Sequence, residues 1–230
     1  MAGIDGLKGF RTLSPGDRER VAGATREQRI PAGKILFSEG QVADTLWAVK
    51  DGVVHIVKSG ADGREIVLEV VPPGELFGAV VALEGRPYPA SAVAAENSVV
   101  WRIPAVLARE LCQKHPSLRA SILEQVTTRL RGAHDRMRSI ALERVEQRLA
   151  RMLLTLAEKI GQRRDRLTVL SVTRQELADM IGTTVETTIR VTSRWQQTGL
   201  IRSSRHQIAL TDIDGLRTLA EGRPAVPCAD

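Results

Sequence analysis

The chain has 230 residues, 43% of them hydrophobic, and a formal net charge of +6 at neutral pH. This length suits two domains with separate cores, and the sequence contains no run of about 18 apolar residues that could cross a membrane. No secretory signal is expected at the N-terminus. The two cysteines, Cys112 and Cys228, are too far apart for a zinc site or a cysteine-ligated iron–sulfur cluster. We therefore expect a cytoplasmic protein with reduced thiols and no metal site.

The positive charge is concentrated in one segment. Residues 144–206 contain twelve Lys and Arg against six Asp and Glu, so this segment accounts for the whole net charge. A basic surface confined to one segment is typical of a protein that binds the phosphate backbone of a nucleic acid.

The N-terminal half is expected to be mainly β-structure after one helix. Residues 14–29 are predicted to be helical, with Ser14 as the N-cap and Pro15 in the first turn. Short β-branched runs then alternate with Gly- and Pro-containing turns up to Pro104, which predicts a compact antiparallel barrel or roll. Asp62-Gly63 is expected to form a hairpin turn. The expected strands are 34–37, 45–49, 53–58, 65–71, 90–94 and 98–103.

A long helical region is predicted after Pro104. Six of its apolar residues are spaced alternately by three and four positions: Leu123, Val126, Leu130, Ala133, Met137 and Ile140. This narrow stripe favours a two-chain coiled coil, and the alternative is a single amphipathic helix that packs on its own β domain. A second helix is predicted over 142–160, and the charged loop 162–166 is expected to be exposed.

The segment 171–201 has the features of a helix-turn-helix. Thr173 and Glu176 are spaced for a capping box at the start of the first helix. Gly182 occupies the position of the tight turn between two helices, and Thr184 is expected to cap the second helix. An ordinary helical hairpin is the alternative.

The second helix and the strands that follow it favour DNA binding over that alternative. Two short strands, 200–202 and 207–210, flank a polar, basic tip and are expected to form a wing. Glu186 and Arg190 share the outward face of the second helix. In the major groove a glutamate accepts from cytosine N4, and an arginine donates to guanine O6 and N7. The segment therefore indicates a winged helix-turn-helix that binds double-stranded DNA.

These motifs resemble those of the CRP/FNR superfamily of bacterial transcription regulators over about residues 10–212. The matching segments are 31–34, 39–40, 51–52, 73–78, 173–176, 182, 185–190 and 199–201. The resemblance implies an α+β chain with an N-terminal cyclic-nucleotide-binding-like β-roll, a long dimerisation helix and a C-terminal winged helix-turn-helix. The expected domains are 1–115 for the sensor, 116–141 for the dimerisation helix and 142–230 for the DNA-binding domain.

The same resemblance implies a homodimer on a palindromic site with TGA-like half-sites. The six-residue stripe would form the dimer interface, and RNA polymerase is an expected partner that the loop 162–166 could contact. Glu186 and Arg190 would read base edges, while other residues would hold phosphates, among them Thr173, Arg174, Thr184 and Thr187. The full set of expected DNA-binding residues is Thr173, Arg174, Gln175, Thr184, Val185, Glu186, Thr187, Ile189, Arg190 and Arg205.

One position of the second helix departs from the pattern of the FNR branch. That branch shares Val185 but carries Ser where this chain has Ile189. The replacement removes a hydrogen-bonding hydroxyl and offers contact with a thymine methyl group instead. Half-site preference beyond the central bases is therefore expected to differ from that of the branch.

The sensor is not expected to bind cyclic AMP. Members that do so hold the ribose and phosphate with a Glu and an Arg, which correspond to Ala79 and Pro89 here. A buried phosphate without a cationic partner is too costly, and a cyclic dinucleotide is no better supported. An iron–sulfur cluster of the FNR type needs an N-terminal cysteine cluster, which this sequence lacks. The expected effector pocket comprises Gly78, Ala79, Pro89, Ala90 and His134.

Three kinds of control stay open: a haem-based gas sensor, a sensor of another small molecule, and an effector-independent regulator. His134 or His55 could ligate haem, although a solvated place on the helix face is the plainer interpretation of His134. An enzyme is not expected, because the sequence has no nucleophile elbow, phosphate-binding loop, paired carboxylates or metal-spaced His cluster. The complete winged domain also argues against a cyclic-nucleotide-gated module of a larger assembly.

Overall fold

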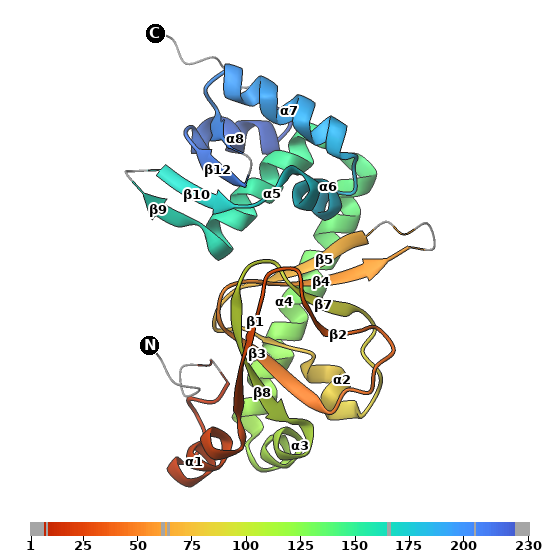
Figure 1. Cartoon of the computed structure of the whole chain (residues 1–230), viewed down its shortest axis with the longest axis vertical. Helices are drawn as coiled ribbons and strands as arrows, with labels where there is room; N and C mark the ends of the chain where they lie inside the picture. Colours follow the sequence, from red (N-terminus) through yellow and green to blue (C-terminus); the bar gives the residue numbers. More distant parts are fainter. Residues whose placement is uncertain are drawn as a thin grey trace. The chain divides into compact units, whose positions relative to one another are not determined.

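The computed structural model describes residues 7, 9–60, 63, 65–164, 167–204 and 206–223. The chain divides into two compact units, Met1–Gly132 and Ala133–Asp230, and the boundary falls inside the long helix α4 (Figure 1). No helix in the described ranges is long and apolar enough to cross a bilayer.

The N-terminal unit is built on two four-stranded sheets, with strand orders β1-β8-β3-β6 and β2-β7-β4-β5. Every strand pair in them is antiparallel, so the predicted antiparallel roll is confirmed. The six predicted strands agree with the structure to within two residues at each end. The elements are α1 Pro15–Ala24, β1 Arg26–Ile30, β2 Ile35–Phe37, β3 Thr45–Asp51, β4 Val54–Ser59, β5 Glu65–Val71, β6 Leu76–Phe77, α2 Ala79–Glu84, β7 Ser91–Ala94, β8 Ser98–Pro104, α3 Ala105–Lys114 and the first part of α4 Pro116–Leu142.

The helix predicted over 14–29 is too long. Ser14 caps α1 as predicted, since its Oγ accepts from the Asp17 N–H at 3.3 Å, but the helix ends at Ala24. The next five residues after Thr25 form β1, which pairs along its whole length with β8. The charged side chains of β1 are compatible with a strand because β1 lies at the edge of its sheet, where charged residues are common.

Strands β4 and β5 form the predicted hairpin, and Ser59 lies opposite Glu65 at its end. Asp62 of the predicted turn lies outside the described residues, whereas Gly63 has a φ of +78°. A left-handed φ of this kind favours glycine, as the turn prediction requires.

Four aromatic rings pack together in the interior of the roll. Phe37 stacks on Tyr88 with 3.7 Å between ring centroids, and the rings of Trp47 and Phe77 lie 5.9 and 6.1 Å from Phe37. The Trp47 indole N–H donates to the Tyr88 hydroxyl at 3.0 Å, and that hydroxyl donates to the Thr45 carbonyl at 2.7 Å. The polar atoms of the cluster are therefore satisfied, and burial raises the pKa of Tyr88.

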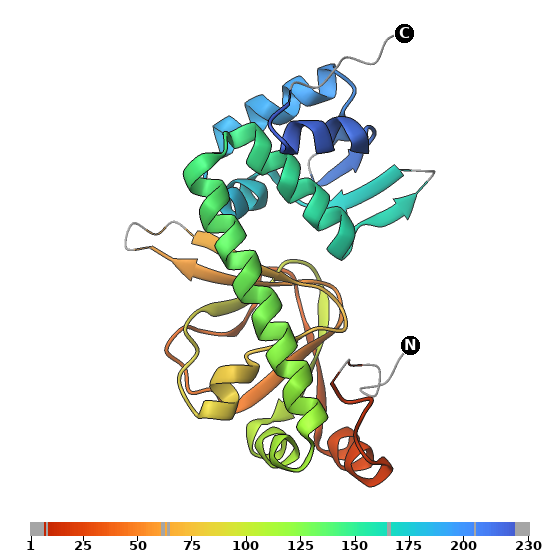
Figure 2. The same ribbon diagram turned by 180° about the vertical axis from the view of Figure 1, so that it is seen from behind.

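The helical region after Pro104 contains a break. α3 ends at Lys114, His115 is extended, and α4 starts at Pro116. Proline favours this break because it lacks the N–H of a continuing helix and presets φ for a first turn. In Figure 2, the part of α4 that belongs to the N-terminal unit runs along the outside of the roll.

A buried carboxylate anchors α1 beside this break. The Asp17 side chain is 3% exposed, and its Oδ2 lies 2.7 Å from Lys114 Nζ and 2.8 Å from His115 Nε2. Ser14 Oγ donates to the same oxygen at 2.8 Å. The hydrogen bond from Lys114, followed by those from His115 and Ser14, holds the pKa of Asp17 well below its usual range.

The C-terminal unit packs helices against a four-stranded sheet of order β11-β12-β10-β9. Its core includes Leu149, Leu153, Leu177 and Trp195, all buried. After the end of α4 its elements are α5 Val145–Ile160, β9 Gln162–Arg164, β10 Leu167–Ser171, α6 Arg174–Ile181, α7 Val185–Gln197, β11 Ile201–Ser203, β12 Gln207–Leu210 and α8 Ile213–Ala220.

The segment predicted as the loop 162–166 is partly a strand. Gln162–Arg164 is exposed, as expected, but it forms β9 and pairs with β10. Its side chains are all long and polar, so the sequence carries no β-branched signal there, and backbone pairing with β10 determines the strand. Residues 165 and 166 of the predicted loop lie outside the described residues.

Candidate nucleic-acid interface

The first helix of the motif, α6, is defined at both ends by its sequence. The Thr173 N–H donates to Glu176 Oε2 at 2.7 Å, and the Glu176 N–H donates to Thr173 Oγ1 at 3.2 Å. This is the predicted capping box. Gly182 ends the helix with a φ of +65°, where its N–H bonds to the Ala178 carbonyl. The predicted tight turn is therefore confirmed.

The second helix, α7, packs on the unit through one face. Thr184 is the N-cap and accepts from the Thr187 N–H at 3.3 Å. The buried face consists of Thr188, Val191, Thr192 and Trp195. The two buried threonine hydroxyls bond to backbone carbonyls of the preceding turn, so neither hydroxyl is left unsatisfied. This packing fixes which side chains point outward.

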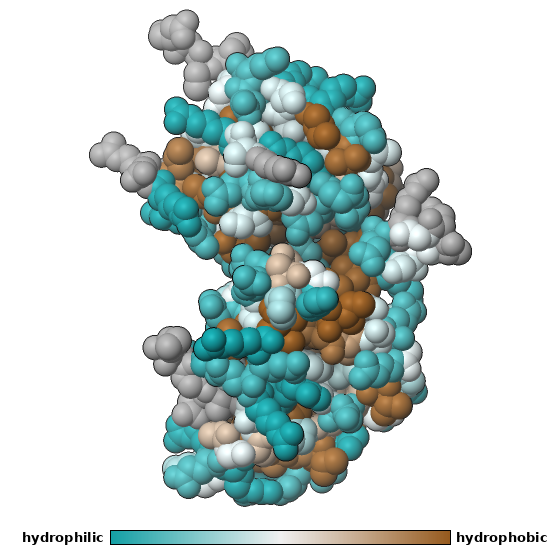
Figure 3. All heavy atoms as spheres, viewed as in Figure 1, coloured by the Kyte–Doolittle hydropathy of each residue, from teal (hydrophilic) through white to brown (hydrophobic). Residues whose placement is uncertain are grey.

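The outward face of α7 follows helical spacing. Glu186, Ile189, Arg190 and Ser193 are exposed, at positions i, i+3, i+4 and i+7. Within the described part of the chain, neither Glu186 nor Arg190 forms an ion pair, so both charges face outward. Ile189 is 49% exposed, a large apolar area for a surface helix. Figure 3 shows apolar side chains over α7 among hydrophilic ones.

The DNA-binding residues expected from the sequence do not include Ser193, although it lies on this exposed face. It lies two turns beyond Glu186 on the same face, so the spacing that selected Glu186 and Arg190 would also have selected it. The side chain is small and polar and therefore carries no chemical signal of its own.

The wing is tied to both helices of the motif. β11 and β12 pair antiparallel, as predicted. Gln196 Oε1 on α7 accepts from the Ser203 N–H at 3.2 Å and from Ser203 Oγ at 2.5 Å. Arg174, at the start of α6, donates to the carbonyl of Ser204. Arg205, the predicted contact at the wing tip, lies outside the described residues.

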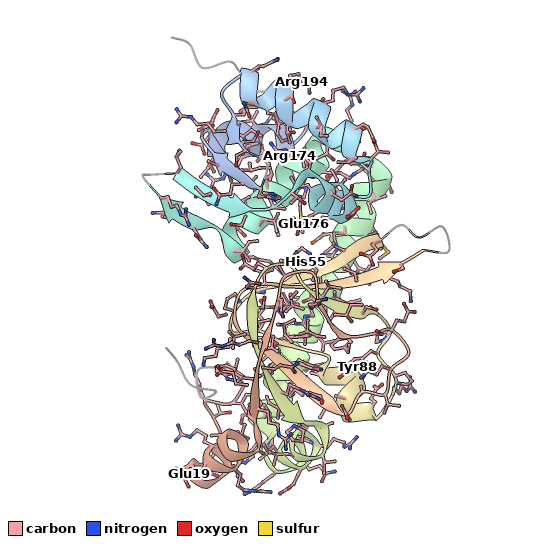
Figure 4. All side chains as sticks on the ribbon, in the orientation of Figure 1. Glu19, His55, Tyr88, Arg174, Glu176 and Arg194 are labelled. Atoms are coloured by element: carbon pink, nitrogen blue, oxygen red, sulfur yellow. The ribbon has the colours of Figure 1, made fainter. Side chains whose placement is uncertain are left out.

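Arg174 therefore has a structural bond that the sequence did not predict. Partial burial lowers the pKa of its guanidinium. The bond to Ser204 uses one of five N–H donors, so the others stay available to a phosphate. Gln175 is also engaged, because its Nε2 donates to Asp179 Oδ1 at 2.8 Å. Figure 4 labels Arg174 and Glu176 on α6 and Arg194 on α7, where Arg194 forms an ion pair with Glu146 of α5.

The predicted seam on α4 is largely uncovered in the single chain. Val126 packs against the core of the roll, and Ala133 is half-buried. The four larger members are exposed: Leu123 66%, Leu130 54%, Met137 59% and Ile140 49%. An intramolecular amphipathic helix would bury these side chains, so their exposure argues against that alternative.

The predicted effector residues of the roll differ in their surroundings, and one of them, Gly78, lies against Tyr88. Gly78 caps α2 with a φ of +67°, and a Cβ added there would lie 3.0 Å from the Tyr88 ring. Ala79 and Ala90 are buried, whereas Pro89 is exposed. His134 lies beyond this unit on α4 and is exposed. His55 is buried in β4 and has interactions of its own (Figure 4).

Two family models match the chain where these features lie. Residues 27–115 match the cyclic nucleotide-binding domain, and residues 147–219 match the Crp-like helix-turn-helix domain. The chain belongs to the CRP/FNR superfamily. The chain is 28% identical over 197 residues to the fumarate and nitrate reduction regulatory protein of Escherichia coli K12. The aligned region covers 85% of this chain and 78% of that protein. The resemblance expected from the motifs is confirmed.

Solved structures of CRP/FNR proteins have the same fold. A CRP/FNR-family transcriptional regulator from Thermus thermophilus is 28% identical, with a TM-score of 0.72 over 86% of this chain and all of that one. The c-di-GMP responsive global regulator CLP of Xanthomonas campestris is 26% identical, with a TM-score of 0.74 over 86% of this chain and 99% of that one. The matched relatives are transcription regulators, not enzymes, and this protein is a CRP/FNR-type transcription regulator.

Proposed function

We propose that this regulator acts as a homodimer that binds a palindromic DNA site with TGA-like half-sites. The observation that carries the proposal is the outward face of α7, where Glu186 and Arg190 are exposed and unpaired within the described residues. Arg190 would donate to guanine O6 and N7, and Glu186 would accept from cytosine N4. Ile189, with its half-exposed side chain, would contact a thymine methyl group, beside Val185 at the start of the helix.

The remaining predicted contacts would hold the phosphate backbone. Thr184 and Thr187 lie at the N-terminus of α7, where backbone N–H groups and the helix dipole favour an anion. Thr173, Arg174 and Gln175 occupy the corresponding end of α6. Arg205 would add a contact from the wing. These contacts set the register of the protein on DNA, while the α7 face supplies base specificity.

The exposed seam on α4 would be the dimer interface. Its four large exposed apolar side chains are expensive to leave in water, and the full six-residue stripe, which alternates by three and four positions, matches the packing of two parallel helices. We assign residues 1–115 to the sensor, 116–141 to the dimerisation helix and 142–230 to the DNA-binding domain. A regulator of this kind acts on the bacterial chromosome, so we place it in the cytoplasm with RNA polymerase as a partner.

The sensor residues do not fit a cyclic nucleotide. Ala79 offers no hydrogen-bonding side chain, and Pro89 has neither a charge nor an N–H. Lys58 reaches the Pro89 carbonyl at 3.2 Å, but its charge is paired with Glu39 at 3.0 Å. A phosphate placed there would compete with that carboxylate. The two cysteines of this sequence, Cys112 and Cys228, do not form a cysteine cluster, so the proposal includes neither a cyclic nucleotide nor an iron–sulfur cluster.

Control without an effector is the form that the structure supports best. The rings of Phe37, Trp47, Phe77 and Tyr88 pack together in the buried core of the roll. Arg129 of α4 donates to the Leu76 carbonyl and pairs with Glu69 at 2.6 Å, so α4 is already fixed to the roll. A haem- or small-molecule-gated regulator is the alternative, with His134 or His55 as the candidate haem ligand. A visible-absorption spectrum of the purified protein tests for the haem.

Selection of binding sites from random duplex DNA tests the proposal. We expect protein purified without added effector to enrich a palindrome with TGA-like half-sites. The variant Arg190→Ala should no longer discriminate between bases at one base pair of each half-site. Equal binding of the preferred sequence by this variant and the wild type would refute the role of α7. A dimer that enriches no sequence, together with a haem absorption band, would favour the gated alternative.

A further inference from the structure

The junction between α4 and α5 contains a network of polar contacts around a buried carboxylate. α4 ends at Leu142, and Arg144 is the N-cap of α5, so Glu143 lies in the connection. The Glu143 side chain is 9% exposed. It accepts from Ser139 Oγ at 2.5 Å, from Arg151 Nη2 at 3.0 Å and from Arg151 Nε at 3.3 Å. The last turn of α4 is thus joined to α5, because Ser139 on α4 and Arg151 on α5 both donate hydrogen bonds to the Glu143 carboxylate.

Two arginines of α5 extend this network, one to α6 of the helix-turn-helix and the other to α8. Arg148 donates to the Glu143 carbonyl at 3.2 Å and to the Ile181 carbonyl, at the end of α6, at 3.1 Å. Arg151 also donates to the Ala220 carbonyl, at the end of α8, at 2.7 Å. The carbonyls at a helix C-terminus have no partner within the helix, so these bonds satisfy them. Both arginines therefore contact Glu143 in the α4–α5 connection, while Arg148 also binds the end of α6 and Arg151 also binds the end of α8.

We propose that Glu143, Arg148 and Arg151 fix the angle between α4 and the helix-turn-helix, and thereby determine which spacing of half-sites the regulator accepts. This inference rests on the proposed homodimer. If the two α4 helices pair along their seam, the position of each α7 depends on how the last turn of α4 is joined to α5 at this junction. A dimer places its recognition helices about one DNA turn apart, near 34 Å, so a change of angle at the junction alters that separation. The three residues are positioning residues, since Arg148 acts through α6, Arg151 acts through α8, and Glu143 holds Arg151.

A spacing assay separates this role from general stability. Two fixed copies of the selected half-site are joined by spacers that differ in length by single base pairs, and full-length protein selects among them. We compare the wild type with Glu143→Gln, Arg148→Lys and the control Glu158→Gln. Glu158 is an exposed glutamate on α5, so its variant has the same change of charge as Glu143→Gln. Circular dichroism and sedimentation confirm that each variant is a folded dimer.

The wild type and the control should select one spacing. Glu143→Gln and Arg148→Lys should accept several spacings, and their affinity for the preferred palindrome should fall about tenfold, because simultaneous binding of both half-sites loses its fixed geometry. Their affinity for a single half-site should stay within about twofold of the wild type, because α7 is unchanged. If Glu143→Gln does not fold, Arg148→Lys alone decides the question. Retention of the wild-type spacing preference and palindrome affinity by the folded variants would overturn the inference. Failure of the wild type to enrich any half-site would instead refute the proposed function.

Discussion

At the scale of single residues, two arginines of the same motif have different surroundings. The sequence assigned both Arg174 and Arg190 to DNA from their places on two consecutive helices. In the structure Arg190 is exposed, while Arg174 is half-buried and bonded to Ser204. Helical spacing predicts the outward direction of Arg190, but the partner of Arg174 lies 30 residues later and leaves no local signal. We therefore expect Arg190 to contribute to base specificity, and Arg174 to contribute to phosphate binding.

The salt dependence of DNA binding distinguishes the two roles. Arg174→Ala should weaken binding about equally on all sequences and reduce the slope of log K against log salt by about 1, because one phosphate contact is lost. Arg190→Ala should leave this slope nearly unchanged and cost about 1–3 kcal/mol at the cognate base pair only. Fluorescence anisotropy at a series of salt concentrations measures both quantities. An unchanged slope for Arg174→Ala would mean that Arg174 only supports the wing.

A second residue-scale prediction concerns Asp17 and pH. Its pKa in the folded state is below the ordinary value of about 3.9, so its stabilising effect is complete above that pH and is lost as the pH falls toward the folded-state pKa. Asp17→Asn should therefore lower the free energy of unfolding at pH 7, and the difference from wild type should narrow at pH 3. Urea unfolding at both values tests this. The control is Glu19→Gln, an exposed residue of the same helix (Figure 4). A constant difference at both pH values would contradict the role of the Asp17 carboxylate.

At the scale of secondary structure, the seam on α4 carries a prediction about assembly. Leu130→Lys places a charge in the middle of the proposed dimer interface and should convert the dimer to a monomer in sedimentation experiments. Since Leu130 is exposed in the single chain, the free energy of unfolding of the monomer should change by no more than about 0.5 kcal/mol. Val106→Lys, on α3, is the control, because Val106 is an exposed apolar residue outside the seam. A Leu130→Lys protein that remains dimeric would exclude this seam as the interface.

Elements with strong local signals were predictable, and those determined by distant contacts were not. The strands with β-branched runs and the capped helices α6 and α7 agree with the sequence-based expectation. β1 was mistaken for the end of a helix because its five residues are mostly charged, and only its pairing with β8 makes it a strand. The short elements β6 and α2 lie within a turn-rich segment and have too few residues for a periodic pattern. α8 follows the wing and was not predicted, although Asp212 caps it in the usual way.

At the scale of the whole molecule, the proposed regulator combines a closed sensor, meaning one that needs no effector, with the exposed outward face of α7. The aromatic cluster occupies the roll interior, and Arg129 attaches α4 to the strands beside it. Under the proposal of control without an effector, these contacts fix α4 to the roll in the absence of a ligand. The proposed contrast with cyclic-nucleotide-binding members rests on a few side chains, Ala79 and Pro89 among them, because the fold itself is shared.

Added cyclic nucleotides should therefore leave the thermal stability of the protein unchanged. A ligand at 100 times its Kd stabilises the folded state by about 2.7 kcal/mol, which raises the Tm of a chain of this size by several degrees, about 2–4 °C per kcal/mol. We expect cyclic AMP, cyclic GMP and cyclic di-GMP each to shift the Tm by less than about 1 °C in differential scanning fluorimetry. A duplex that contains the selected palindrome serves as the positive control. A reproducible rise with any of the three nucleotides would contradict the closed sensor.

The placement of the tryptophans gives this protein an internal optical label. Of its three tryptophans, Trp47 and Trp101 belong to the N-terminal unit, and Trp195 is the one in the C-terminal unit. Trp195 is 2% exposed on the inner face of α7. In a protein with both Trp47→Phe and Trp101→Phe, all tryptophan fluorescence would therefore come from Trp195, on the buried face of α7. Its emission maximum and quenching by acrylamide would report directly on the packing of α7 while the protein searches DNA.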